Sequence, residues 1–147
     1  MQYETTCSAV VEGNHASLWA TWADMAAYPS WDPREEETRL DGPFAVGTTG
    51  WSKQVGRRPG GPFTITVVQP EHRWVNECPL PGGRLVIDHT LDDDGDNRVR
   101  LTKTYTVHGP MALAFRLVFA RAIRRDVPGT LAALASEAAR RDGIRAA

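Results

Sequence analysis

The chain has 147 residues, about the length of one domain, and we expect residues 1–147 to fold as a single domain. A full-size α/β barrel needs roughly 250 residues, so that class is excluded on length. Hydrophobic residues make up 41% of the chain and charged residues 24%, which is near the average for globular domains, and the formal net charge is −1. Because this balance provides no broad positive field, we expect no nucleic-acid partner.

The N-terminal residues contain no basic stretch followed by an apolar core, so they do not read as a secretory signal. No segment approaches the ~18 consecutive apolar residues of a membrane helix, and we expect no membrane insertion. The two cysteines, Cys7 and Cys78, lie far apart without metal-binding spacing. Reduced, unpaired thiols in a cytoplasmic protein are the interpretation we favour.

The chain begins with a predicted strand and a short helical unit. Residues 2–11 are rich in Thr and Val and end at a break around Gly13, which is typical of a strand. Asn14 is a candidate N-cap for a helix that extends to about residue 27. Pro29 and Pro33 follow, and we expect them to end that helix.

Residues 35–107 have a different pattern, with short Thr, Val, Ile, Leu and Trp runs between clusters of turn-forming residues. The turn clusters lie at 41–43, 58–62, 69–71, 79–83 and 92–97. The runs predict strands near 34–40, 47–55, 62–69, 72–78, 84–91 and 98–107. Short turns between successive strands predict an antiparallel meander.

From residue 111 to about 141, apolar residues return every three or four positions, which predicts a long amphipathic C-terminal helix. Pro128 removes one backbone hydrogen bond, so we expect a kink or two abutting helices there, with Asp126 available as a cap. The predicted fold class is therefore α+β: a seven-stranded curved antiparallel sheet, two short helices and a long kinked helix. A helix about 10 Å wide cannot fill the concave face of such a sheet, so we also expect a cavity.

Alternation along the predicted strands assigns odd positions to the inner face from residue 51 to residue 107. The apolar residues in this register are Trp51, Val55, Phe63, Ile65, Val67, Val75, Leu85, Ile87, Leu91, Val99, Leu101, Tyr105 and Val107. Four polar residues share it: Lys53, Glu77, His89 and Lys103. Pairing Leu91 with Val99 would make His89 and Lys103 diagonal neighbours.

Each polar residue also has a purely structural interpretation. His89 can be a hydrogen-bonded core histidine, and a single β-bulge would turn Glu77 and Lys53 to solvent. Lys103 can extend its ammonium to the sheet edge. The aromatic residues, taken singly, are more often core than ligand contacts.

Several kinds of chemistry lack their sequence motifs. The four histidines form no HExxH motif and no zinc-type spacing, so we expect no metal site. Residues 42–49 superficially resemble a phosphate loop but lack its lysine, and no nucleophile elbow is present. We therefore expect no cofactor.

Short sequence motifs accompany this predicted order of strands and helices. They are Leu18-Trp19-Ala20, Asp24, Tyr28-Pro29-Ser30-Trp31-Asp32-Pro33, Gly47-Thr48-Thr49-Gly50, Leu80-Pro81-Gly82, Asp88-His89-Thr90-Leu91 and Val107-His108-Gly109-Pro110. Over essentially its whole length the chain resembles the polyketide cyclase/dehydrase and lipid transport group of the START/Bet v 1-like (SRPBCC) superfamily. The resemblance implies a helix-grip fold with a deep, mostly apolar cavity. It does not imply one function, because such folds serve cyclases, carriers and sensors.

From chemistry and alternation we predict a cofactor-independent cyclase or dehydratase acting on a hydrophobic, carbonyl-bearing small molecule. His89 would transfer the proton, Lys103 would stabilise the oxyanion with Tyr105 as a second donor, and Glu77 and Asp32 are weaker acid/base candidates. The predicted ligand contacts are Trp19, Trp31, Trp51, Phe63, Ile65, Ile87, Leu101, Phe115 and Phe119. The alternative is a non-catalytic carrier or sensor in which His89 and Lys103 anchor a carboxylate or hydroxyl. Either a monomer or a homodimer is compatible with the sequence.

Overall fold

The computed structural model describes residues 1–56 and 59–146, so the predicted turn at 58–62 begins outside the described residues. All seven predicted strands are present in one antiparallel sheet of order β1-β7-β6-β5-β4-β3-β2. The strands are β1 (Gln2–Glu12), β2 (Glu35–Leu40), β3 (Thr49–Gln54), β4 (Gly61–Gln69), β5 (Arg73–Leu80), β6 (Gly83–Asp93) and β7 (Arg98–His108).

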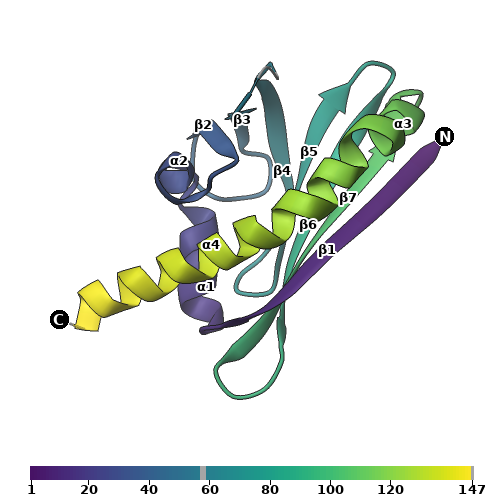
Figure 1. The fold of residues 1–147 in the computed structure, drawn as a ribbon. Helices are drawn as coiled ribbons and strands as arrows, with labels where there is room; N and C mark the ends of the chain where they lie inside the picture. The colour runs from purple at the N-terminus through teal and green to yellow at the C-terminus, as the bar shows by residue number, and fades with distance from the viewer. Residues whose placement is uncertain (57–58, 147) are drawn as a thin grey trace.

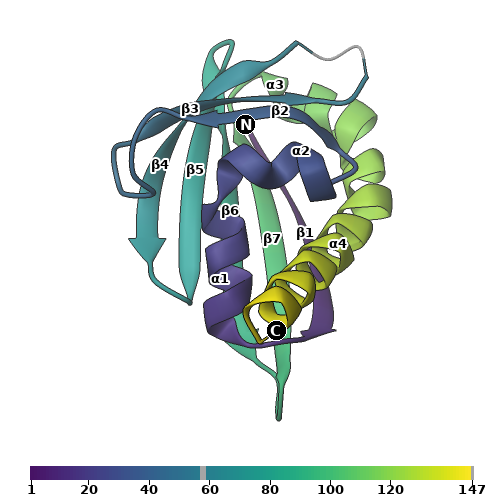
Figure 2. The ribbon, with the colours of Figure 1, turned by 90° about the vertical axis from the view of Figure 1, so that its left-hand side faces the viewer.

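The sheet curves around the C-terminal helix. Figure 1 shows the long helix α4 (Ala120–Ala146) lying across one face of the sheet, with α1 (His15–Ala23) beside its C-terminal part. Figure 2 shows β2 and β3 crossing above the ends of the other strands, so the sheet forms a half-barrel that opens toward α4. The inner face of the sheet and the helices therefore enclose the interior.

The N-terminal helical unit is formed by three short pieces. The side chain of Asn14 accepts a hydrogen bond from the Ser17 N–H at 2.9 Å, which confirms the predicted N-cap of α1. A 3₁₀ turn, η1 (Met25–Ala27), leads into α2 (Tyr28–Trp31). Pro29 does not end a helix as predicted. It occupies the first turn of α2, where a proline loses no intrahelical hydrogen bond.

The C-terminal helical region is irregular before α4 begins. A short helix, α3 (Met111–Ala114), is followed by a π-helical turn, η2 (Phe115–Phe119). Pro128 lies inside α4, which is one continuous helix, so the alternative of two abutting helices with Asp126 as a cap is wrong, and a kink at Pro128 stays a prediction. Because Pro128 is exposed, the carbonyl that its missing N–H leaves unpaired can be hydrated.

The hydrophobic core lies between the inner face of the sheet and the helices. Its fully buried side chains come from both layers: Leu18, Ile65, Trp74, Leu91, Val99, Leu101, Val107, Val127, Leu131 and Leu134. Burial of their apolar surface contributes ~25 cal/mol of stabilising free energy per Å². This hydrophobic contribution is the main one that holds α4 against the sheet.

The predicted alternation holds for β6 and β7. Leu91 lies opposite Leu101, Ile87 opposite Tyr105, and Leu85 opposite Val107, all in the odd register. The pairing is shifted by two residues from the prediction, because Asp93 rather than Leu91 lies opposite Val99. His89 therefore faces Lys103 directly instead of diagonally.

In β5 the predicted alternation is wrong. The hairpin joining β5 to β6 pairs Leu80 with Gly83, so even positions of β5 share a face with odd positions of β6. Trp74 and Asn76 therefore point inward, while Val75 and Glu77 lie on the outer face.

Two further register changes correct the remaining inward assignments. A bulge between Ile65 and Val67 places Val68, opposite Trp74, on the inner face in place of Val67. In β3, Gly50 lies opposite the inward Phe63, so Trp51 and Lys53 face outward. Val55 lies beyond the end of β3 and is exposed.

Candidate functional site

The middle of the inner face carries an ammonium group. Lys103 lies on β7 between Cys7 of β1 and His89 of β6. Its Nζ is 5.5 Å from the centroid of the Tyr105 ring, and no ion pair to Lys103 exists within the described part of the chain. Burial by itself lowers the pKa of Lys103, but Tyr105 and the carboxylates of Asp32 and Glu35 outweigh burial and hold that pKa above its ordinary value. The interior therefore contains a stable cation.

Glu35 supplies a carboxyl group to the same interior. A bulge between Glu35 and Glu37 places Glu35 opposite Gln54 on the inner side of the β2–β3 pair, and the Thr38 hydroxyl lies 3.4 Å from its Oε2. Burial, opposed by Lys103, raises the pKa of Glu35 to about 7. A carboxyl with this pKa can both accept and donate a proton at neutral pH.

Asp32 is a second interior carboxylate and is 7% exposed. Its Oδ1 accepts hydrogen bonds from the Arg34 N–H at 2.9 Å and from the Thr130 hydroxyl at 3.3 Å. The bond from Thr130 connects the end of α2 to α4. Asp32 therefore fixes the helix layer and adds negative charge near Lys103.

His89 is buried within an aromatic cluster. Its ring stacks on Trp74 with centroids 3.6 Å apart and packs edge-on against Trp22. Nδ1 lies 3.2 Å from the Trp74 carbonyl oxygen, which accepts a hydrogen bond, so the neutral ring carries its proton on Nδ1. Burial and the Lys103 ammonium hold the pKa of His89 well below its usual range. These features match the core-histidine interpretation more closely than that of a proton-transfer group.

Three buried polar atoms near this interior have no hydrogen-bond partner among the described residues: Trp31 Nε1, Trp74 Nε1 and Asn76 Oδ1. Asn76 is 8% exposed and lies opposite Ile87 on the inner face. Leaving such groups buried without a partner is costly, so they are the two donors and the acceptor in this region that a water or a ligand would satisfy.

Part of the inner face remains accessible. Cys78, Leu85 and Ile87 lie on inward register positions of β5 and β6 yet are only half-buried. A recess of about 310 Å³ opens between α4 and the β2–β3 pair, lined by Pro33, Arg34, Gln54, Val55, Ala122, Arg125 and Asp126. A second, of about 240 Å³, lies between α4 and the turn after β1. Both recesses lie at the rim, and a deep central cavity stays a prediction.

The structure brings together most of the predicted catalytic residues but not Glu77. Lys103, Tyr105 and His89 share the inner face, and Asp32 approaches from the helix layer. Glu77 faces outward and pairs with Arg84 at 3.4 Å, because the β5–β6 hairpin reverses the parity. The predicted inward orientation of Glu77 is therefore wrong. Lys53 is likewise outward and pairs with Glu36.

The predicted ligand contacts also divide by position. Phe63, Ile65, Ile87, Leu101 and Phe115 belong to the core or pack against it, as do Trp31 and Phe119. Trp19 packs edge-on against Phe44 at the margin of the core. Trp51 faces outward and lies over Gly60, so its predicted inward position is wrong.

Glu35 and Asn76 lie on the inner side and Arg34 lines the first recess, but none of the three was predicted as a site residue from the sequence. Glu35 stands in the run Glu35-Glu36-Glu37, which reads as a solvated acidic edge, and the bulge places Glu35 rather than Glu36 on the inner side. Asn76 is recognisable in the sequence as a polar residue between the apolar residues Trp74 and Cys78. This pattern becomes visible only when the even positions of β5 are assigned to the inner face.

Two kinds of feature are absent from the described residues. No helix in this part of the chain is long and apolar enough to cross a membrane. The same residues contain no cluster of three or more His, Cys, Asp or Glu side chains able to hold a metal ion.

Comparison with solved structures finds the same fold. The Zhui aromatase/cyclase from Streptomyces sp. R1128 is 14% identical with a TM-score of 0.80, over 96% of each chain. A norcoclaurine synthase point mutant from Thalictrum flavum, in complex with a transition state analogue, is 14% identical with a TM-score of 0.73, over 93% of this chain and 96% of that one. Ara h 8.0201 is 11% identical with a TM-score of 0.75, over 94% of this chain and 98% of that one. At these identities the likeness concerns the fold alone.

Comparison with curated proteins finds no match. Residues 3–139, however, match the sequence pattern of a family described as polyketide cyclase/dehydrase and lipid transport, which agrees with the strand order and the position of α4. The chain belongs to the polyketide cyclase/dehydrase and lipid transport family.

Proposed function

We propose that the protein binds a hydrophobic, carbonyl-bearing small molecule between the sheet and α4 and promotes cofactor-independent ring closure or dehydration. The observation that carries this proposal is the presence of two complementary groups, the Lys103 ammonium and the Glu35 carboxyl, in one apolar interior. The family match and the aromatase/cyclase fold likeness support the reaction class.

The chemistry assigns one role to each group. Glu35, as carboxylate, takes a proton from the carbon next to a ligand carbonyl, and the electron pair moves to the carbonyl oxygen. The Lys103 ammonium and the Tyr105 hydroxyl stabilise that enolate oxygen. The enolate carbon then attacks a second carbonyl of the same molecule, and the resulting alkoxide takes a proton from Glu35. In a dehydration, the Glu35 carboxylate takes a further proton from the carbon next to the carbonyl. The electron pair of that C–H bond forms the double bond as the adjacent C–O bond breaks, and Glu35 passes the proton to the departing hydroxyl, which leaves as water.

We assign proton transfer to Glu35 rather than to His89. The imidazole is stacked flat on Trp74 and hydrogen-bonded to its carbonyl, so it is held as part of the wall. Apolar side chains around the site would hold a flexible chain in a closing conformation. Positioning of this kind can supply several kcal/mol of the barrier reduction.

A carrier or sensor function is the second candidate. Lys103 has no ion-pair partner within the described residues, so its ammonium is available to anchor a ligand carboxylate or hydroxyl without any reaction. In that case the neighbouring carboxyl of Glu35 would only adjust the charge of the interior.

The two candidates are separated by measuring affinity and single-turnover rate together on a poly-β-ketone substrate. Lys103→Met should keep binding while the rate falls roughly 10²–10³-fold, as when one oxyanion donor is removed. Glu35→Gln should lower the rate roughly 10²–10⁴-fold. The matched control is Glu36→Gln, because Glu36 pairs with Lys53 on the outer side. Unchanged rates in both test variants would leave the carrier function.

A further inference from the structure

The recess between α4 and the β2–β3 pair carries more positive than negative charge. Its lining includes the guanidinium groups of Arg34 and Arg125 and the carboxylate of Asp126. Arg125 donates to both carboxylate oxygens of Asp126, at 2.8 and 3.1 Å, so these two side chains largely neutralise each other. The charge of Arg34 remains.

The Arg34 guanidinium has no hydrogen-bond or ion-pair partner in the part of the chain that the structure describes. Its backbone, in contrast, is held on both sides. The N–H donates to Asp32 Oδ1 at 2.9 Å, and the carbonyl accepts from the Val55 N–H at 2.9 Å. The backbone bonds fix the position of Arg34 at the recess, and its unpartnered guanidinium can form a charge-assisted, bidentate pair with a carboxylate or phosphate.

The position of Arg34 connects this recess to the interior. Arg34 lies between Asp32 and Glu35 in sequence, and its charge acts on both the Glu35 carboxyl and the Cys7 thiol of the inner face. Gln54, which also lines the recess, lies opposite Glu35 across β2 and β3, so the recess adjoins the interior site at these residues. A molecule seated in the interior and extending outward would pass Arg34.

We propose that this recess binds an anionic group of the ligand, a carboxylate or a phosphate, through the Arg34 guanidinium. The inference rests on the proposed function in one respect, namely that the apolar part of the same molecule lies between the sheet and α4. The substrate class is thereby narrowed to amphiphiles with an apolar, carbonyl-bearing body and an anionic end.

The test uses ligands with one alkyl chain and different ends: dodecanoate, dodecyl phosphate, methyl dodecanoate and dodecanol. Each displaces the neutral fluorescent probe N-phenylnaphthylamine, whose own binding reports on the apolar interior. We expect the wild type to bind the anionic ligands about three- to tenfold more tightly than the neutral ones, as for a charge-assisted contact partly exposed to solvent. Arg34→Gln should abolish that preference, and Arg34→Lys should retain part of it.

The matched control is Arg121→Gln, which removes the same charge from an exposed position on α4 outside the recess. It should keep the preference for anions. A preference for dodecanoate alone assigns the site to carboxylates, and a preference for dodecyl phosphate alone assigns it to phosphates. Equal affinity for charged and neutral ligands in the wild type, or a preference unchanged by Arg34→Gln, overturns the proposal.

Failure of the neutral probe to bind would count against the proposed function rather than against the anion site. The site is then tested with inorganic phosphate by amide NMR. Amide shifts at Arg34 and at residues 122–126 that disappear in Arg34→Gln support it. Absence of such shifts in the wild type overturns it.

Discussion

His89 lies directly opposite Lys103 across β6 and β7. Two positive charges at these facing positions would repel each other in a poorly hydrated interior, so one of the groups must stay neutral. Burial and the Lys103 ammonium lower the pKa of His89 well below its usual value, so the imidazole is the neutral member. The pair therefore couples the stability of the fold to pH.

The first prediction concerns stability in acid. Because His89 is neutral in the folded protein and titrates near its ordinary pKa when unfolded, the unfolded chain binds more protons below about pH 6.5. The free energy of unfolding should therefore fall as pH decreases from about 6.5, by at most about 1.4 kcal/mol per pH unit from this residue. Chemical denaturation of wild type and His89→Gln between pH 5 and 8 measures the difference, and the variant should lack this component.

The control for this experiment is His72→Gln, because His72 is exposed. It should retain the acid sensitivity of the wild type. An unchanged pH dependence in His89→Gln would mean that the imidazole is protonated, or hydrated, in the folded state.

The second prediction concerns Glu35, which acts in the opposite direction. Its folded pKa of about 7 lies above the ordinary 4.5, so the folded protein binds more protons between these values and loses stability as pH rises through them. The loss has an upper bound of about 3 kcal/mol, reduced by the partial exposure of the carboxyl. Glu35→Gln should therefore raise stability above pH 7 relative to the wild type, while Glu36→Gln should not. The pKa of Glu35 can be measured from the NMR chemical shift of its carboxyl carbon as a function of pH. A midpoint near pH 4.5 would contradict the raised pKa assigned to Glu35.

The order of the helices and strands, and the residues on the inner face of β6 and β7, could be predicted from the sequence. There, apolar residues recur at the odd positions of 85–91 and 99–107 with only His89 and Lys103 as polar exceptions, and the hairpin between the strands preserves odd parity. The predicted inward orientation of odd positions is wrong for β5, because the Pro81-Gly82 turn pairs the even position Leu80 with the odd position Gly83. A turn's residue count, rather than any side chain, decided which way Glu77 points.

Bulges explain the other differences. Of the three adjacent glutamates, the sequence offers no reason to select Glu35, since all three are equally polar. The extra residue between Glu35 and Glu37 rotates one of them inward, while Glu36 pairs with Lys53. A bulge depends on how β2 fits against its neighbours, which alternation along one strand does not encode.

The third prediction concerns Gly50 of β3. A Cβ on Gly50 would lie 2.3 Å from Phe63 Cζ and 2.5 Å from the Arg39 carbonyl oxygen. Phe63 is buried, and the second contact is with backbone, so the clash cannot be relieved by moving a flexible side chain. Gly50→Ala should lower the free energy of unfolding by about 1–3 kcal/mol, the usual range for overpacking. Gly61→Ala is the control, because nothing lies within 4 Å of its added Cβ. Equal midpoints for the two variants in urea would show that Phe63 can move aside.

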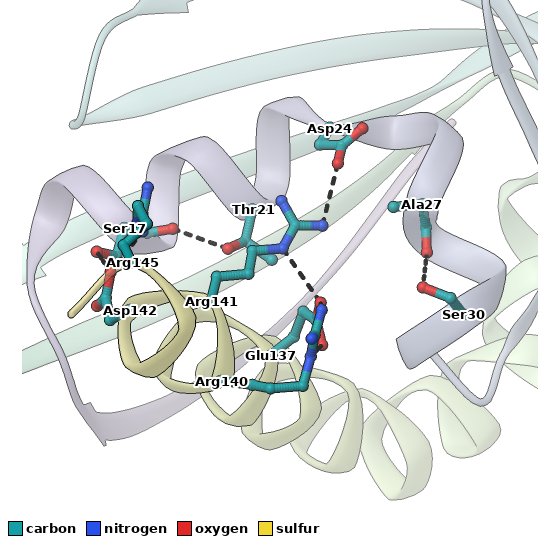
Figure 3. Close-up of polar contacts among 10 residues, drawn as sticks. All are labelled: Ser17, Thr21, Asp24, Ala27, Ser30, Glu137, Arg140, Arg141, Asp142 and Arg145. Atoms are coloured by element: carbon teal, nitrogen blue, oxygen red, sulfur yellow. Dashed lines mark hydrogen bonds and ion pairs between the residues drawn. The ribbon is translucent and has the colours of Figure 1, made fainter. Parts of the chain in front are cut away.

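The fourth prediction concerns the ionic contacts that hold the end of α4 against α1. Figure 3 shows Arg141 between Glu137 of its own helix and Asp24 beyond α1, with its Nη2 3.0 Å from Asp24 Oδ2. The hydrogen bond from Arg140, together with that from Arg141, lowers the pKa of Glu137 to about 2, against an ordinary value of 4.5. The unfolded chain therefore binds more protons between these values, and the stabilisation is complete above about pH 4.5 and is lost as pH falls toward 2.

Glu137→Gln should destabilise the protein by about 1 kcal/mol at pH 7, because the charge-assisted bonds are lost, and by little at pH 2. Urea denaturation at both pH values measures this, with the exposed Glu12→Gln as a control that should match the wild type. A constant difference between Glu137→Gln and wild type at the two pH values would show that packing, rather than the carboxylate charge, connects these helices.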